Sequence, residues 1–491
     1  MTTSVEFLQK KVAAQSAPIE SFPIYVSGQF KTTHRTLDVI SPYSGDVVYQ
    51  TYLAGDQEYE QAVQAAEKVR EDMRKLPIFQ RFKILNEISE GIAKYREDVA
   101  KIMSREAAKP LKAAHAEADR AAQTFLIAAE EAKRLPGEVM RLDWTPAAQN
   151  KEAIIKYFPV GLVAGISPFN FPLNLVAHKI APAIAAGCPI VLKPASKAPI
   201  LALLLAKIID QTTLPKGAVS ILLMDRDTGN KLVNDERFAL LSFTGSPEVG
   251  WEMKKNAGKK KVVLELGGNA GLIIEKDADL QRAITKSVVG AFGNTGQSCI
   301  HTQRIFVEAS VFDEFTRRFQ AEAKKLTVGD PEDEATDVSA MIDDKNARRI
   351  EQWIDEAKQA GAEVLLGGHR TGTVYAPTIL TNTRPDMKVC ALEAFAPIVV
   401  VERFTRFEEA VAAINHSNFG LQAGVFTNDY KKIHYAFENL EVGGVTINEV
   451  PTYRADQMPY GGVKDSGLGR EGPKYAILDL MEPRILVLDH T

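Results

Sequence analysis

The chain has 491 residues, more than one ordinary hydrophobic core accommodates, so we expect two or more domains. Hydrophobic residues make up 45% and charged residues 25%, as in globular proteins, and the formal net charge of -4 favours neither nucleic acid nor an anionic membrane as a partner. An odd, sparse set of cysteines, no apolar run of roughly 18 residues and no secretory signal at the N-terminus predict a cytoplasmic protein. The histidines show no paired spacing, so we expect no metal site.

The first 158 residues predict short strands, then helices, then a ribbon. Ile24 to Phe30 is typical of a hairpin that turns at Ser27-Gly28. From Asp56 to about Ala132, apolar residues recur at helical spacing, which fits four amphipathic helices. Residues 137–158 then form two extended stretches around a polar turn. We expect this ribbon to project, with an open edge at which another subunit can add a strand.

Strands and helices alternate in the rest of the chain. Before Gly267-Gly268, strands are predicted at 161–166, 189–192, 219–223, 240–244 and 262–266, and helices at 175–186, 198–210 and from 247. This series predicts a parallel sheet covered on both faces. After a domain boundary near Gly267-Gly268, helices are predicted at 280–292, 311–325, 347–361 and 407–415, and strands at 304–307, 398–402, 423–426, 444–447 and 484–489.

The stretch from Gly293 to Cys299 presents a thiol after small and polar residues, as a reactive cysteine requires. An unreactive loop thiol is the alternative. Cys188 and Cys390 lie beside apolar segments, and we interpret both as buried and inert.

Two polar residues near strand ends suit acid–base or oxyanion chemistry. Glu265 lies in an apolar strand, where burial would raise the pKa of its carboxyl toward neutrality, as a general base needs. A structural ion pair is the alternative. Asn170 lies in a loop made rigid by Pro168 and Pro172, where its amide could bind an oxyanion or satisfy its own turn.

Three further segments are compatible with a bound nucleotide. Lys193 follows a strand, where it could bind a ribose hydroxyl or an extra phosphate, or be solvated. Gly245 and Gly250 surround a helix start that suits a pyrophosphate, although a plain turn would look the same. The glycine-dense stretch 461–472 either wraps another part of the chain or forms a mobile loop.

The order and spacing of these motifs resemble the aldehyde dehydrogenase superfamily of NAD(P)-dependent, non-phosphorylating enzymes. The resemblance extends from about residue 20 to about residue 485. Its motifs are Pro168–Pro172, Lys193-Pro194, Phe243–Ser246, Leu264–Asn269, Gly296–Cys299, Glu393–Pro397 and Pro459–Gly462. Within the superfamily the motifs resemble those of lactaldehyde, succinate-semialdehyde and glyceraldehyde-3-phosphate enzymes, which implies oxidation of a small polar or anionic aldehyde to its acid.

The resemblance implies a role for each matching residue. Cys299 would form a thiohemiacetal with the aldehyde, and loss of hydride to the cofactor would leave a thioester. Asn170 and the Cys299 N–H would bind the oxyanion, Glu265 would activate the hydrolytic water, and Lys179 would support the proton path. The residues implied to bind NAD or NADP are Ser167, Pro168, Phe169, Lys193, Ser196, Gly229, Phe243, Thr244, Gly245, Ser246, Leu266, Gly267, Glu393 and Phe395.

Some positions refine this expectation. Ser196 stands where NAD-preferring relatives often have glutamate, so we expect NADP to be accepted. Arg120 and Arg454 match arginines that bind anionic aldehydes, and Ile300 completes the implied substrate pocket. A surface ion pair is the alternative for each arginine. Ser298 and Phe171 replace the arginine and tyrosine of glyceraldehyde-3-phosphate enzymes, which makes that substrate doubtful.

The family's architecture is α/β. The resemblance implies a Rossmann-like cofactor domain (1–136 and 159–267), an α/β catalytic domain (268–472) and a β oligomerisation arm (137–158 and 473–491) of a homodimer or homotetramer. Three alternatives stay open: a cysteine hydrolase or acyltransferase that uses His301 as its base, a CoA-acylating semialdehyde dehydrogenase, and a binding protein without activity. CoA-acylating relatives lack the carboxylate of Glu265, which favours hydrolysis.

Overall fold

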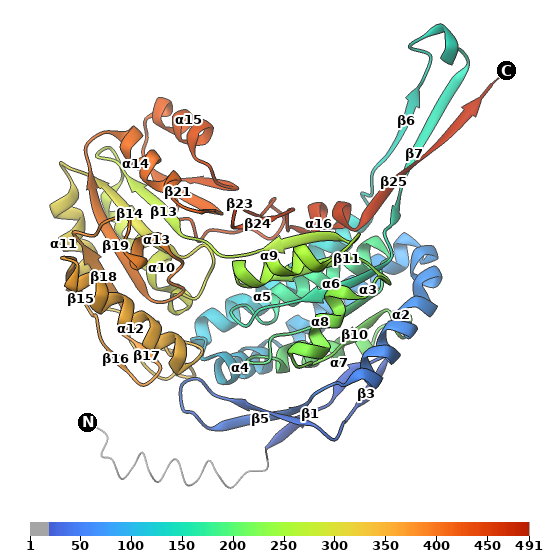
Figure 1. Cartoon of the computed structure of the whole chain (residues 1–491), viewed down its shortest axis with the longest axis horizontal. Helices are drawn as coiled ribbons and strands as arrows, with labels where there is room; N and C mark the ends of the chain where they lie inside the picture. Colours follow the sequence, from blue (N-terminus) through green and yellow to red (C-terminus); the bar gives the residue numbers. More distant parts are fainter. Residues whose placement is uncertain (1–18, 491) are drawn as a thin grey trace.

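The computed structural model describes residues 19–490. The N-terminal residues on which the expected lack of a secretory signal depends lie outside this range. Two α/β lobes form the body, and a β arm extends from the first of them (Figure 1). The α/β, Rossmann-like fold class predicted from the sequence is confirmed. The division into domains at the stated residues stays a prediction.

The first lobe is built on a sheet of strand order β24-β12-β11-β8-β9-β10-β2-β3. Strands β8 to β12 are parallel, because the helices between them return the chain to the same edge. The predicted hairpin is confirmed as β2 and β3. The strands are β2 (Ile24–Val26), β3 (Gln29–Lys31), β8 (Leu162–Ile166), β9 (Ile190–Lys193), β10 (Val219–Ile221), β11 (Phe238–Thr244), β12 (Lys261–Glu265) and β24 (Gly467–Leu468).

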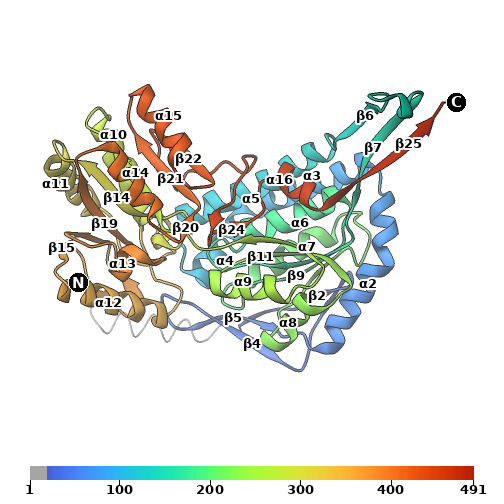
Figure 2. The same cartoon turned by 45° about the horizontal axis from the view of Figure 1, so that its top comes forward.

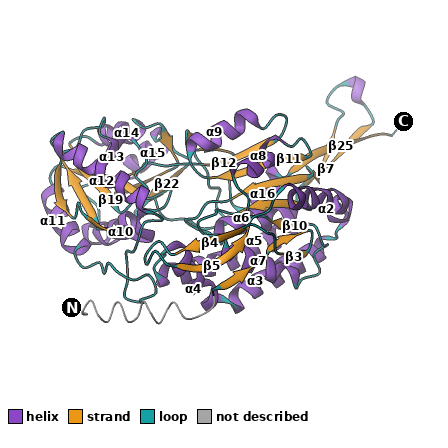
Figure 3. Ribbon diagram, turned by 60° about the horizontal axis from the view of Figure 1, so that its bottom comes forward, coloured by secondary structure: helices purple, strands orange, loops and turns teal. Residues whose placement is uncertain are grey.

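Helices pack around these strands, as Figure 3 shows in purple and orange. The four helices predicted before residue 132 are confirmed. The helices of this lobe are α2 (Asp56–Lys75), α3 (Ile78–Lys94), α4 (Arg96–Ala107), α5 (Leu111–Ala132), α6 (Asn174–Ala186), α7 (Ile200–Asp210), α8 (Arg226–Asn234), α9 (Pro247–Asn256) and α16 (Pro473–Asp479). Helix α8 was not predicted, because it is short and polar and contains Gly229. Its start is stabilised by Asp225, whose carboxylate accepts the Thr228 N–H at 2.9 Å.

The second lobe has a sheet of order β15-β18-β19-β14-β13-β21-β22. Strand β13, beside the middle of this sheet, was not predicted, because its five residues directly follow the glycines taken as a domain boundary. The strands are β13 (Ala270–Ile274), β14 (Thr302–Glu308), β15 (Glu363–Leu366), β18 (Thr378–Thr381), β19 (Ile398–Phe404), β21 (Gln422–Phe426) and β22 (Gly444–Ile447). The helices are α10 (Leu280–Phe292), α11 (Phe312–Ala323), α12 (Asp344–Gln359), α13 (Lys388–Ala391), α14 (Phe407–Asn415) and α15 (Tyr430–Asn439).

The predicted ribbon is confirmed as β6 (Gly137–Arg141) and β7 (Lys151–Pro159), joined by the short helix η1 (Pro146–Ala148). The terminal strand β25 (Met481–Asp489) pairs antiparallel with the whole of β7, so the arm has the order β25-β7-β6. Figures 1 and 2 show this arm extending beyond the body, with the C-terminal strand along its side.

The glycine-dense stretch near the C-terminus connects the two lobes. Strand β23 (Val463–Lys464) pairs with β20 (Phe419–Gly420), and β24 adds to β12 in the first sheet. Of the two alternatives for this stretch, the one in which it wraps another part of the chain is therefore correct. Small sheets are formed by β1 (Glu20–Phe22), β4 (Thr36–Ile40) and β5 (Val47–Tyr52), and by β16 (Arg370–Thr371) and β17 (Val374–Tyr375). Between residues 19 and 490, none of the helices has the length and apolar character needed to cross a membrane.

Candidate active site

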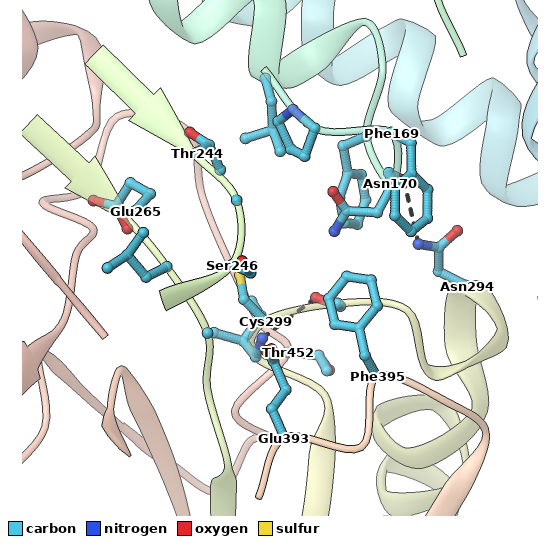
Figure 4. Close-up of a pocket in the computed structure, with 18 of the residues that line it drawn as sticks. Phe169, Asn170, Thr244, Ser246, Glu265, Asn294, Cys299, Glu393, Phe395 and Thr452 are labelled. Atoms are coloured by element: carbon cyan, nitrogen blue, oxygen red, sulfur yellow. Dashed lines mark hydrogen bonds between the residues drawn. The ribbon is translucent and has the colours of Figure 1, made fainter. Parts of the chain in front are cut away.

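A cavity of about 700 Å³ lies between the lobes, beside the carboxyl ends of β8, β11 and β12. Figure 4 shows Glu265 and Thr244 on one side of Cys299, and Phe169 and Asn170 on the other. Most residues predicted from the sequence are brought together on its wall. They are Asn170, Glu265 and Cys299, the predicted cofactor residues Pro168, Phe169, Thr244, Gly245, Ser246, Leu266, Gly267, Glu393 and Phe395, and the predicted substrate residues Arg120, Phe171, Ser298, Ile300 and Arg454.

A second cavity of about 580 Å³ lies beside the first sheet. It is lined by four further predicted cofactor residues, Lys193, Ser196, Gly229 and Phe243. Arg226, at the start of α8, also lines it but was not predicted, because the helix itself was not recognised. Ser167 and Lys179 line neither cavity. Both are buried, and the Lys179 ammonium donates to Ser242 Oγ at 3.0 Å and to Thr244 Oγ1 at 2.8 Å.

The loop that presents Cys299 has an unusual backbone. After α10 comes the short turn η2 (Gly293–Gly296), in which Asn294, Thr295 and Gly296 have φ values of 52°, 55° and 66°. A left-handed conformation is costly for a β-branched residue such as threonine. Surrounding bonds hold it: Thr295 Oγ1 accepts the Ser339 N–H at 3.1 Å, and the Asn170 amide donates to the Gln297 carbonyl at 3.0 Å. The nucleophile loop is thus tied to the predicted oxyanion residue.

Close backbone contact fixes the position of the thiol. A Cβ on Gly268 would lie 1.9 Å from the Cys299 carbonyl oxygen, so only glycine fits there. The Gly268 N–H donates to Glu393 Oε1 at 2.8 Å, which joins this predicted cofactor-binding carboxylate to the same strand end. Burial raises the pKa of Glu393 to about 7. Strand β12, the cysteine loop and the Glu393 loop therefore form one packed unit.

The Cys299 thiol lies 3.0 Å from the hydroxyl of Tyr460. Burial raises the pKa of the thiol to about 12, and the Tyr460 hydrogen bond and the Arg454 charge oppose that rise. Tyr460 itself is buried, and the guanidinium of Arg454 stacks on its ring at 3.8 Å from the ring centre. The sequence motif Pro459–Gly462 contains this tyrosine, but no role was predicted for it.

Glu265 is buried, and neither of its carboxylate oxygens has a hydrogen-bond partner within the described residues. Burial, together with the negative charge of Glu471, raises the pKa of Glu265 well above its usual value. Glu471 lies 3.8 Å from the Lys179 ammonium. A carboxyl group with free lone pairs and a raised pKa can accept a proton from a water molecule near neutral pH.

The two predicted substrate arginines are both paired with carboxylates. Arg120 donates to Asp456 at 2.8 and 3.1 Å, and Arg454 donates to Glu471 at 2.9 Å. Asp456 does not line the cavity, so it holds the Arg120 guanidinium from behind. Nε and Nη2 of Arg120 are bonded to Asp456, and Nη1 has no recorded partner among residues 19–490. These acidic partners were not predicted. Asp456 is 336 residues from Arg120 in the sequence, and Glu471 lies in the glycine-dense stretch.

The other candidate nucleophile and base residues are placed away from this chemistry. His301 is buried outside the cavity lining, its Nε2 has no hydrogen-bond partner among residues 19–490, and burial lowers its pKa to about 4. Cys188 is fully buried, and burial raises its pKa to about 11. Cys390 is half-buried, with its pKa also raised to about 11 by burial. A hydrolase that pairs Cys299 with His301 is not supported.

The cavity walls fit a dinucleotide. Gly245 and Ser246 bring the N-terminus of α9 to the wall, where free N–H groups and the helix dipole suit a pyrophosphate. At Gly267, a Cβ would lie 2.8 Å from Glu393 Oε2, so a side chain would fill this part of the wall. Phe169 and Phe395 meet edge to face with ring centres 5.9 Å apart, which leaves an apolar place for a flat ring.

Comparison with known proteins gives a consistent family. Residues 30–486 match the model of the Aldehyde dehydrogenase family. A 3-sulfolactaldehyde dehydrogenase from Priestia aryabhattai is 41% identical over 472 residues, 96% of this chain and 98% of the relative. The crystal structure of aldehyde dehydrogenase 21 from Physcomitrella patens, in complex with the reaction product succinate, is 41% identical. It has a TM-score of 0.95 and covers 97% of this chain and 99% of its own. A third relative is the glyceraldehyde-3-phosphate dehydrogenase GapN from Methanocaldococcus jannaschii, complexed with NADP. Its structure is 40% identical, has a TM-score of 0.89 and covers 93% of this chain and 100% of its own.

Proposed function

Because the chain belongs to the aldehyde dehydrogenase family and uses NAD or NADP, we propose that it oxidises a small anionic aldehyde to the carboxylic acid. The observation that carries this proposal is the placement of Cys299, Glu265 and two arginines on one cavity wall. The thiolate of Cys299 attacks the aldehyde carbon, and the oxyanion that forms is held by the Asn170 amide and the Cys299 N–H. When bound, NAD(P)⁺ accepts the hydride that leaves this carbon.

Hydrolysis of the resulting thioester is assigned to Glu265. Its unpaired oxygens accept a proton from water, the water oxygen attacks the thioester carbon, and the sulfur leaves as the free thiol or thiolate. Lys179 and Glu471, 3.8 Å apart, supply a route by which Glu265 returns its proton toward solvent. The presence of this carboxylate favours a free acid over an acyl-CoA product.

Both nicotinamide cofactors are proposed to be accepted, with NADP favoured. Lys193, Ser196 and Arg226 line the second cavity, which supplies two positive charges and a hydroxyl for a 2′-phosphate. The carboxylates on the same wall are Asp225, which is paired with Arg35, and Glu252, and position 196 itself carries none. The kcat/KM values for the two cofactors test this directly. A preference of about tenfold or more for NAD would overturn it.

The anionic substrate is proposed from Arg120 and Arg454. The succinate of the Physcomitrella enzyme and the sulfonate of the Priestia substrate are small anions of the size that two arginines can hold. Phe171, whose ring centre lies 3.9 Å from the Lys109 ammonium and 5.8 Å from the Arg120 guanidinium carbon, replaces the tyrosine expected for glyceraldehyde 3-phosphate. Carboxylate or sulfonate aldehydes are therefore favoured over phosphate aldehydes.

The deciding experiment is a panel of aldehydes assayed by the growth of reduced-nicotinamide absorbance. Succinate semialdehyde, 3-sulfolactaldehyde, lactaldehyde, glyceraldehyde 3-phosphate and hexanal would be compared with NAD and with NADP. We expect the highest kcat/KM for a carboxylate or sulfonate aldehyde, and an increase of KM for it in Arg454→Ala. An unchanged KM for all anionic aldehydes in that variant would refute the substrate assignment.

The domain roles follow the same proposal. The first lobe would bind the cofactor, the second would supply the nucleophile, and the arm would join copies of the chain into a homodimer or homotetramer. The three cysteines are free, which supports a reducing compartment such as the cytoplasm.

A further inference from the structure

The residue nearest to the Cys299 sulfur that has no assigned role is Tyr460. Its hydroxyl oxygen lies 3.0 Å from Sγ, and either atom could donate. Tyr460 is only 3% exposed, so this hydroxyl is not freely exchanged for water. Its neighbour Gly461 lies against Glu265, because a Cβ there would be 2.9 Å from Glu265 Oε1. One segment therefore contacts both the nucleophile and the predicted base.

The ring of Tyr460 is backed by a cation. The Arg454 guanidinium carbon lies 3.8 Å from the ring centre, and its side chain is 8% exposed. Glu471 anchors Arg454 at 2.9 Å, so the guanidinium is held in the stacked position. A cation on the face of a phenol polarises the ring and makes its hydroxyl a better hydrogen-bond donor.

The neighbours of the thiol have opposite effects on its ionisation. Glu265 and Glu393 disfavour a thiolate, whereas Tyr460 and Arg454 favour it. A partly buried sulfur that feels two carboxyl charges needs a donor to carry negative charge. Among the described residues, the Tyr460 hydroxyl is the side-chain group at hydrogen-bond distance from this sulfur that can donate to a thiolate.

We propose that the Tyr460 hydroxyl donates a hydrogen bond to the thiolate of Cys299, and that Arg454, stacked on its ring, strengthens that bond. Tyr460 keeps its own proton, and a solvent water molecule in the cavity accepts the proton of the thiol. This inference deepens the proposed function, because it rests on Cys299 as the nucleophile. It makes Tyr460 a residue that activates the thiol before aldehyde is attacked.

The test measures the thiol alone, without aldehyde or cofactor. Iodoacetamide alkylates the thiolate with release of iodide, and its second-order rate is followed at pH values between about 6 and 9. Tyr460→Phe keeps the ring and its packing but removes the hydroxyl. Loss of the hydrogen bond lowers the thiolate fraction while a more basic sulfur reacts faster, so we expect a net fall in rate of about four- to fifteenfold.

The matched control is Tyr453→Phe, which removes a hydroxyl from a neighbouring tyrosine that is 52% exposed. Its rate should equal that of the wild type. Arg454→Lys keeps the charge but loses the stacked plane, so its rate should also fall, and adding it to Tyr460→Phe should cause little further loss. These effects would be non-additive, which a general loosening of the fold would not produce.

Two results would overturn the proposal. A Tyr460→Phe rate within about twofold of Tyr453→Phe would mean that the hydroxyl does not act on the sulfur. A faster rate would mean that Tyr460 accepts the thiol proton and holds Cys299 protonated. Mass spectrometry of the alkylated protein, with Cys299→Ser as the blank, identifies which cysteine has reacted. It therefore separates failure of the Tyr460 proposal from failure of the proposed function. Alkylation that occurs at Cys188 or Cys390 instead of Cys299 would contradict the nucleophile itself.

Discussion

Single side chains in this site differ from their exposed counterparts because of what surrounds them. Glu265 is the clearest example, since burial and the charge of Glu471 raise its pKa. It acts as a base only when ionised, so kcat should fall as pH decreases through this raised pKa. In Glu471→Gln the like charge is gone while Arg454 and Lys179 remain. The pKa of Glu265 then falls, and the acidic limb of the kcat profile moves to lower pH.

The measurement for this prediction is kcat against pH at saturating aldehyde and cofactor. Glu482→Gln serves as the control, because Glu482 is an exposed residue paired with Lys261 on the arm. It should leave the limb in place. A limb that stays fixed, or moves to higher pH, in Glu471→Gln would show that another group controls it.

Backbone contact at one glycine is predicted to control the nucleophile. In Gly268→Ala the new methyl group would lie 1.9 Å from the Cys299 carbonyl oxygen, so the cysteine loop must move. A displacement of about 1 Å can cost roughly a hundredfold in rate, and we expect kcat to fall by at least that much. Gly137→Ala, where the nearest atom is 3.6 Å away, should retain full activity. Comparable kcat values for the two variants would contradict the contact.

At the level of elements, a buried ion pair between Glu117 and Lys109 contacts the start of helix α6. Glu117 accepts the Leu173 and Asn174 N–H groups at 3.0 and 3.1 Å and is bonded to Lys109, with both side chains almost fully buried. Glu117→Ala would leave the Lys109 ammonium unpaired, and we expect a loss of about 3–5 kcal/mol in unfolding free energy. Urea unfolding measures it. The double variant Glu117→Leu with Lys109→Met should be more stable than Glu117→Ala. If it is not, the unpaired charge is not the cause.

Element prediction succeeded where a periodic pattern was long and failed where function interrupts it. The helices of residues 56–132 and the seven-residue strands β11 and β14 were predicted. Strand β13 is five residues long, begins directly after Gly268-Asn269, and contains Gly271. Gly268 is required by a close contact with Cys299, and Gly271 by a close contact with Ile414. Neither contact can be inferred from the neighbouring residues in the sequence. The same holds for α8, whose polar residues face the second cavity.

Across the whole molecule, sequence motifs located the cavity but not the charges behind it. Asn170, Glu265 and Cys299 follow strands or helices whose ends meet, so their motifs could place them together. Arg120 and Asp456 are 336 residues apart and meet only through folding. The sequence predicted both arginines as substrate ligands, with a surface ion pair as the alternative, and in the structure each arginine has an acidic partner that is itself buried. A substrate anion must compete with, or add to, these pairs, which sets the strength of binding.

The arm predicts how copies of the chain assemble. Strand β25 is the edge of the arm sheet, and its residues Ile485, Leu486 and Val487 are 54%, 55% and 49% exposed. Apolar residues on an open strand edge favour pairing with another copy. The wild type should therefore have the mass of a dimer or a tetramer of the 53.9 kDa chain. In a variant with Ile485→Lys and Val487→Lys, charge at the edge should reduce it to 53.9 kDa.

Light scattering after size-exclusion chromatography measures this mass. Phe79→Lys is the control, because Phe79 is 67% exposed and belongs to α3 rather than to the arm, so it should leave the assembly intact. The iodoacetamide rate of Cys299 should be the same in the assembled and the dissociated protein, since the thiol and its recorded contacts belong to one copy. A monomeric wild type would contradict the assembly role of the arm. A double variant that keeps the wild-type mass would instead place the interface elsewhere, because two ammonium groups buried between paired strands would cost more than the contact contributes.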